Sequence, residues 1–137
     1  MALNGLIGMG VPQDWATHGI GHELTAYHGI DHARTLAIVL PGMMNIRRRE
    51  KEEKIVQYAE RIWNITSGTA DERINAAIKK TEEFFIQMGI PVRLPDYDVP
   101  AYTIDKIVSR FGKRNTLMGE RRDIDATVTA KILADRL

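Results

Sequence analysis

Apolar and polar positions alternate with a helical period along most of the chain. In "EEKIVQYAERIWN" (residues 52–64), apolar side chains recur every three or four residues, at Ile55, Tyr58, Ala59, Ile62 and Trp63. This spacing matches the 3.6-residue turn of an α-helix with one apolar face. The pattern therefore predicts an amphipathic helix over 52–64 that packs against another element.

A second helix is predicted over residues 70–88. Thr69 and Glu72 have the spacing of a capping box, which satisfies backbone N–H groups at a helix start, and Gly89 is a typical residue for a helix end. One face of this helix is expected to be apolar and to carry Ile74, Ile78, Thr81, Phe85 and Met88.

Two further helices are predicted in the first third of the chain. One starts after Pro12, with Asp14 in the capping region, and continues to about Tyr27. The next begins near His32, and Pro41 with Gly42 is expected to kink or end it.

The last third predicts two shorter helices after a proline-rich connector, "IPVRLPDYDVP" (90–100). They are "TIDKIVSRFG" (103–112) and "DIDATVTAKILADRL" (123–137), the second capped by Asp123 and carrying Ile124, Val128 and Ile132 at spacing four. Since no segment alternates as a strand, the fold class is all-α: a bundle of about six helices in one domain, 1–137.

Composition narrows the class of protein. The chain has 19 Lys and Arg against 18 Asp and Glu, so its net charge of +1 favours neither nucleic acid nor a membrane surface. The longest apolar run, "LAIVLPGMM" (36–44), is far shorter than the roughly 20 residues of a membrane span, and the start has no basic leader. With no cysteine, a metal would need imidazole or oxygen ligands. We expect a cytoplasmic protein, in which "RRREKEEK" (47–54) is a solvated helix face.

All four histidines lie within "HGIGHELTAYHGIDH" (18–32). On a helix, His18 and His22 lie one turn apart on one face, about 6 Å along the axis. A turn at Gly29 can bring His32 back to the same place. This clustering predicts a metal or acid/base site.

Other residues of this stretch have competing interpretations. Gly19 and Gly21 each cost a helix about 1 kcal/mol relative to alanine, so another helix or a bound ligand is expected to approach them closely, and the neighbouring histidines favour the ligand. Asp14 is interpreted as a cap rather than a ligand, and His28 as a helix-end residue. Trp15 and Tyr27 are assigned to packing, with Trp15 also a candidate for lining a pocket.

The segment "GVPQDWATHGIGHELTAYHGIDHARTLAIVLP" resembles the metal-binding stretch of the iron-containing alcohol dehydrogenases, in their butanol dehydrogenase and aldehyde reductase branch. The segments "KIVQYAERIWNI", "ERINAAIKKTEEFF" and "MGIPVRL" are similar to the rest of that family's helical C-terminal domain. The resemblance implies homodimeric enzymes that interconvert primary alcohols and aldehydes with NAD or NADP and one divalent metal, Fe²⁺ or Zn²⁺.

The family's H-x3-H-x9-H pattern matches His18, His22 and His32. The resemblance implies that His18 and His32 are metal ligands. It places His22 beside the nicotinamide and the substrate, as a catalytic proton-relay or positioning group that also contacts the cofactor.

The resemblance also implies missing parts. The family's other two ligands, an Asp and a His, lie upstream of the segment that "ALNGLIG" resembles, and no such pair stands here unless Asp14 substitutes. The N-terminal nucleotide-binding domain is absent as well. We therefore expect part of a longer enzyme, with weak metal affinity and no turnover alone. Two alternatives stay open: a stand-alone helical metal-binding module, and a non-catalytic interaction domain that self-associates.

Overall fold

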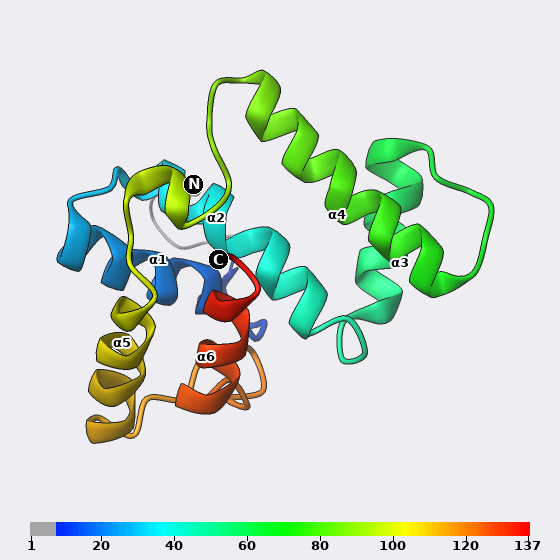
Figure 1. The fold of residues 1–137 in the computed structure, drawn as a ribbon. Coiled ribbons are helices and arrows are strands. Elements are labelled where there is room, and N and C mark those ends of the chain that lie inside the picture. The colour runs from blue at the N-terminus through cyan, green and yellow to red at the C-terminus, as the bar shows by residue number, and fades with distance from the viewer. Residues whose placement is uncertain (1–7) are drawn as a thin grey trace.

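The computed structural model describes residues 8–137, and these form six α-helices and one short 3₁₀ helix (Figure 1). Predictions about the first seven residues, including most of the "ALNGLIG" resemblance and the character of the N-terminus, lie outside this part. The elements are α1 (Ala16–His28), α2 (His32–Ile46), α3 (Glu52–Trp63), α4 (Ala70–Gln87), η3 (Pro95–Tyr97), α5 (Tyr102–Lys113) and α6 (Ala126–Ala134). The all-α prediction of about six helices is confirmed.

Helix α2 is the centre of the arrangement. It packs against α1, α4 and α6, while α3 pairs with α4 and α5 with α6. Figure 1 shows α3 and α4 on one side of α2 and the remaining helices on the other. Pro41 and Gly42 do not end α2, which continues to Ile46.

The main core joins α1, α2, α5, α6 and the connector before α5. Its fully buried members include Ile20 and Leu24 of α1 and Ile38 and Val39 of α2. A smaller cluster of Met44, Ile55 and Ile74 joins α2 to α3 and α4. Because α2 contributes to both clusters, it ties the two halves of the molecule together.

The capping prediction for α4 is confirmed. The Thr69 hydroxyl accepts from the Glu72 N–H at 3.3 Å, and the Glu72 carboxylate accepts from the Thr69 N–H at 2.8 Å. The Thr69 N–H and the Thr69 hydroxyl both donate to the Glu72 carboxylate, and these two hydrogen bonds lower the pKa of Glu72. The far end of the predicted apolar face is different: Met88 lies beyond the helix and is 64% exposed.

The predicted cap of the last helix is wrong. Helix α6 begins at Ala126, and Asp125 is its cap, because the Asp125 carboxylate accepts from the Val128 N–H at 2.8 Å. Asp123 instead forms an ion pair with Arg47. The intervening residue, Ile124, is held in a single antiparallel bridge with Met118, so the chain is still extended there.

The prediction of a solvated helix face at 47–54 is also wrong for its first residues. Residues 47–51 form a turn between α2 and α3. Arg47 is only 6% exposed, and its guanidinium pairs with Glu50 at 3.2 Å in addition to Asp123. A charge run read only from the sequence does not reveal that two carboxylates from separate segments compensate one buried arginine.

None of the helices in residues 8–137 is both long and apolar enough to span a membrane.

Candidate metal centre

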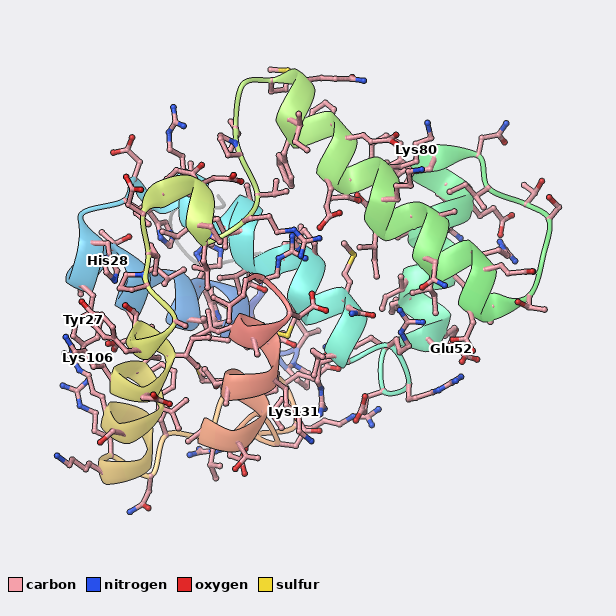
Figure 2. All side chains as sticks on the ribbon, viewed as in Figure 1. Tyr27, His28, Glu52, Lys80, Lys106 and Lys131 are labelled. Carbon is pink, nitrogen blue, oxygen red and sulfur yellow. The ribbon has the colours of Figure 1, made fainter. Side chains whose placement is uncertain are left out.

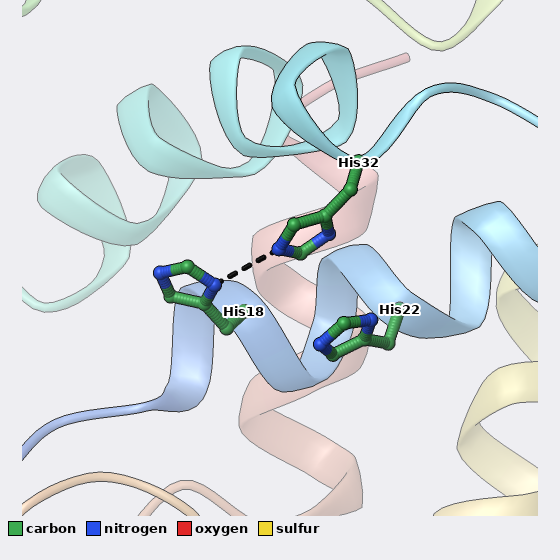
Figure 3. Close-up of side chains that lie close together, drawn as sticks. All are labelled: His18, His22 and His32. Atoms are coloured by element: carbon green, nitrogen blue, oxygen red, sulfur yellow. Dashed lines mark hydrogen bonds between the residues drawn. The ribbon is translucent and has the colours of Figure 1, made fainter. Parts of the chain in front are cut away.

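Three of the four histidines come together at the contact between α1 and α2. His18 and His22 lie one turn apart on α1, and His32 is the first residue of α2 (Figure 3). One nitrogen atom from each ring can be chosen so that all three lie within 4.8 Å of one another. The turn that brings His32 back contains Gly29 at a φ of 66°, a left-handed conformation that glycine adopts without strain.

The three rings are closely arranged. His18 Nδ1 and His32 Nε2 are 2.9 Å apart, a hydrogen bond in which one imidazole donates and the other accepts. The rings of His22 and His32 stack, with centroids 4.2 Å apart and planes 5° from parallel. His22 is exposed, whereas His18 and His32 are partly buried.

This geometry fits a divalent cation. Two nitrogens bound at about 2.1 Å lie about 3.0 Å apart at a right angle and about 3.4 Å apart at the tetrahedral angle of Zn²⁺ sites, so the 2.9 Å between His18 Nδ1 and His32 Nε2 needs only a small opening to admit an ion. The environment also favours the neutral ring that a metal needs. Partial burial lowers the pKa of His32, and the neighbouring His22 and His18 lower it further. An all-imidazole group of this kind suits Zn²⁺ or Fe²⁺.

Asp14 is not a member of this cluster. Its carboxylate accepts from the Ala16 N–H at 3.0 Å and pairs with Lys51 at 2.8 Å. Burial raises its pKa, but these hydrogen bonds and the charge of Lys51 outweigh burial, so the pKa is lowered overall. Asp14 therefore has the structural role that was predicted, at the entry to α1 rather than at its formal cap, Trp15.

His28 also lies apart from the cluster, as the last residue of α1. Its Nε2 forms a hydrogen bond with the Thr103 hydroxyl of α5 at 2.9 Å. The residue before His28, Tyr27, lies beside Lys106 of α5 (Figure 2). Tyr27 and Lys106 line a groove of about 540 Å³ between α1 and α5. Tyr27 is 38% exposed, so its assignment to packing holds only in part.

Trp15 is not a core residue, because it is 60% exposed. Its indole N–H donates to Gln13, and its ring meets the His18 ring edge-on at a centroid distance of 5.2 Å. The indole therefore borders the histidine cluster, and its alternative assignment to a pocket lining stays a prediction.

The two glycines of α1 are explained by protein neighbours. A Cβ at Gly21 would lie 2.7 Å from Thr35 Oγ1 of α2, and a Cβ at Gly19 would lie 2.7 Å from Met118 Sδ. The preference for a ligand at these glycines was therefore wrong: α2 and the segment before α6 fill the space. Thr35 and Met118 were missed by sequence reasoning. The three-residue spacing of His32 and Thr35 was the available signal, since it places both on one helix face.

Comparison with known proteins matches residues 1–136 to the family described as "Fe-containing alcohol dehydrogenase family, C-terminal". The NADPH-dependent aldehyde reductase YqhD of Escherichia coli is 54% identical over 96% of this chain, which covers 34% of the relative. The NADH-dependent butanol dehydrogenase A of Clostridium acetobutylicum is 32% identical over 92% of this chain, covering 33% of the relative.

Solved structures agree with these matches. The substrate- and cofactor-free form of Escherichia coli YqhD has a TM-score of 0.90 and 51% identity, over 96% of this chain and 35% of that one. An NADH-dependent butanol dehydrogenase A from Thermotoga maritima has a TM-score of 0.84 and 28% identity, over 98% of this chain and 36% of that one. The chain thus spans about a third of the length of the relatives it matches.

Proposed function

This chain belongs to the Fe-containing alcohol dehydrogenase family, in its C-terminal part, and from that premise we propose that it is the helical metal-binding part of a nicotinamide-dependent aldehyde reductase or alcohol dehydrogenase. The observation that carries the proposal is the 2.9 Å approach of His18 and His32, with His22 stacked beside them. The relatives named as an aldehyde reductase and a butanol dehydrogenase support a primary alcohol or aldehyde as the substrate class.

We assign His18 and His32 as ligands of Fe²⁺ or Zn²⁺. When bound, such an ion supplies a Lewis acid for an alcohol or aldehyde oxygen, and a nicotinamide cofactor supplies or accepts hydride. His18 lies on α1 and His32 on α2, and both helices contribute to the main core. The ligand atoms are therefore positioned before an ion binds. We assign the further ligands and the nicotinamide site to the part of the relatives' length that this chain does not cover.

His22 has a different proposed role. Its ring is exposed and stacks on His32, so solvent reaches it although one of its nitrogen atoms lies within 4.8 Å of the other two candidate nitrogen atoms. An imidazole that solvent reaches can act as a general acid or base. We assign it to proton delivery at the substrate and to contact with the nicotinamide, rather than to metal binding.

The test is an anaerobic titration of the chain with Co²⁺, whose visible absorption reports bound imidazole. The wild type is expected to bind one equivalent weakly, because the chain offers only two of the assigned ligands, and His18→Ala and His32→Ala are expected to bind at least tenfold more weakly still. Tight one-to-one binding by the wild type would instead support a stand-alone metal-binding module. His28→Ala is the matched control, because His28 lies on the same helix outside the cluster. Equal binding by all four proteins, or loss of binding in His28→Ala alone, would refute the ligand assignment.

His22→Ala separates its two possible roles. If His22 delivers protons, this variant keeps the wild-type Co²⁺ affinity. If it weakens Co²⁺ binding as much as His32→Ala does, His22 is a third ligand. Two predictions remain for direct assay: the 137-residue chain alone gives no NADPH oxidation with an aldehyde, and light scattering finds a homodimer.

A further inference from the structure

A buried hydroxyl lies directly behind the candidate ligand His32. Thr35 is fully buried, one turn along α2 from His32. Its Oγ1 donates to the His32 backbone carbonyl at 2.7 Å. The same oxygen lies 3.5 Å from His32 Nδ1, a long hydrogen-bond distance. Because the single hydroxyl proton is already used on the carbonyl, Oγ1 can meet Nδ1 only as an acceptor.

This arrangement favours one of the two neutral tautomers of His32. A neutral imidazole has one N–H and one lone pair. If Nδ1–H donates to Thr35, the lone pair is on Nε2, the atom that lies 2.9 Å from His18. Nε2 is thus the nitrogen that faces the other candidate ligand. Metal-binding histidines commonly donate their second ring N–H to an oxygen acceptor, which fixes the tautomer and the ring orientation.

The position of Thr35 depends on Gly21. A Cβ at Gly21 would lie 2.7 Å from Thr35 Oγ1 and 3.3 Å from Thr35 Cβ. Both atoms belong to a fully buried residue that cannot swing outward, so a side chain at position 21 must push α1 and α2 apart or rotate the hydroxyl away. The glycine costs helix α1 about 1 kcal/mol relative to alanine. Glycine at position 21 leaves the space in which the Thr35 hydroxyl lies behind His32.

We propose that Thr35 is a positioning residue of the metal site: its hydroxyl selects the His32 tautomer with Nδ1–H and a free Nε2, and Gly21 leaves the room that this hydroxyl needs. The role rests on the proposed function for its purpose, but the tautomer itself is a property of the metal-free chain. The two can therefore be measured separately.

The experiment compares Thr35→Val, which exchanges the hydroxyl for a methyl group, with Thr35→Ser, which keeps it. Long-range ¹H–¹⁵N NMR spectra of the metal-free proteins report which nitrogen of His32 is protonated. Wild type and Thr35→Ser are expected to show Nδ1–H, and Thr35→Val a mixture with Nε2–H. In Co²⁺ titrations, Thr35→Val is expected to lose about 10- to 100-fold in affinity, the usual effect of removing such a partner. Thr35→Ser should recover most of this loss.

Gly21→Ala should lose affinity in the same range. Its matched control is Gly19→Ala, two residues away on α1, where the added Cβ meets only the flexible end of Met118. An unchanged His32 tautomer in a folded Thr35→Val protein would overturn the proposal, as would equal loss in Thr35→Val and Thr35→Ser. If the wild type shows the Nδ1–H tautomer but does not bind Co²⁺ through His18 and His32, the proposed function fails while the positioning contact stands.

Discussion

Gly42 tests how closely α2 and α6 are packed. A Cβ built at Gly42 would lie 2.8 Å from the Ile132 carbonyl oxygen and 2.7 Å from Arg136 Cδ. The first contact is with helix backbone, which cannot move without shifting α6. The second is with the largest fully buried side chain of the described residues: Arg136 is 1% exposed and donates to the Val92 carbonyl at 3.0 Å. Neither neighbour can give way alone.

The magnitude follows from two opposing terms. Alanine gains about 1 kcal/mol over glycine inside a helix. Overpacking a core contact costs about 1–3 kcal/mol, and here both neighbours are held, so the upper part of that range applies. Gly42→Ala should therefore lower the free energy of unfolding by about 1–2 kcal/mol. For a chain of this size, that is a decrease of about 3–7 °C in Tm.

Urea unfolding followed by circular dichroism measures this difference. The matched control is Gly112→Ala in α5, where the added Cβ meets nothing within 4 Å and the helix propensity gain is unopposed. That variant should be as stable as the wild type or up to about 1 kcal/mol more stable. A Gly42→Ala protein at or above wild-type stability would refute the close α2–α6 contact, because the propensity gain would then be acting without a steric cost.

Two further predictions concern a helix cap and pH. Thr69→Ala should lower the free energy of unfolding by about 1 kcal/mol in urea titrations, because α4 loses its capping box. The control, Thr66→Ala in the exposed loop before α4, should leave the free energy of unfolding unchanged. Equal losses in the two variants would contradict the cap. The pKa of His32 is lowered by burial and then by His22 and His18. At pH values between this lowered pKa and the ordinary histidine value, the unfolded chain therefore binds more protons than the folded chain. Stability of the metal-free chain should therefore decrease as the pH falls below about 6.5, and His32→Gln should flatten that decrease; the same slope in both proteins would contradict the assignment.

Sequence patterns predicted the helices well where the deciding interactions are local. The Thr69–Glu72 box depends on contacts within one turn and is present, and the helix predicted over 52–64 is present as α3, although Ile62 of its predicted apolar face is 61% exposed. They failed where a distant residue decides. By sequence, Asp123 and Asp125 are equally good helix caps. The Asp123 carboxylate instead pairs with Arg47, 76 residues away, so Asp125 caps the helix. The burial of Arg47 was missed for the same reason.

For the candidate metal site, too, the contacts between residues close in sequence were predictable and those with distant residues were not. His18, His22 and His32 lie within fifteen residues, so one helix turn and one glycine turn bring them together, and the local pattern was enough to predict their proximity. What surrounds them was not predictable. Gly19 was expected to face a ligand, yet its neighbour is Met118, almost one hundred residues later. No periodicity in residues 18–32 can report a side chain that arrives from the other end of the chain.

The histidine cluster and the core share the same two helices, and this links site geometry to stability. On α1, His18 and His22 bracket Ile20, which is fully buried, and on α2, His32 precedes the buried Ile38 and Val39 by two turns. Any change that separates α1 from α2 removes apolar contact and moves His32 away from His18 together. A close-packed interior resists such separation, because even a small gap forfeits contact energy on both sides. The core therefore holds the two helices, and with them His18 and His32, at their spacing, whereas the contact between Thr35 Oγ1 and His32 Nδ1 concerns the orientation of the His32 ring within that spacing.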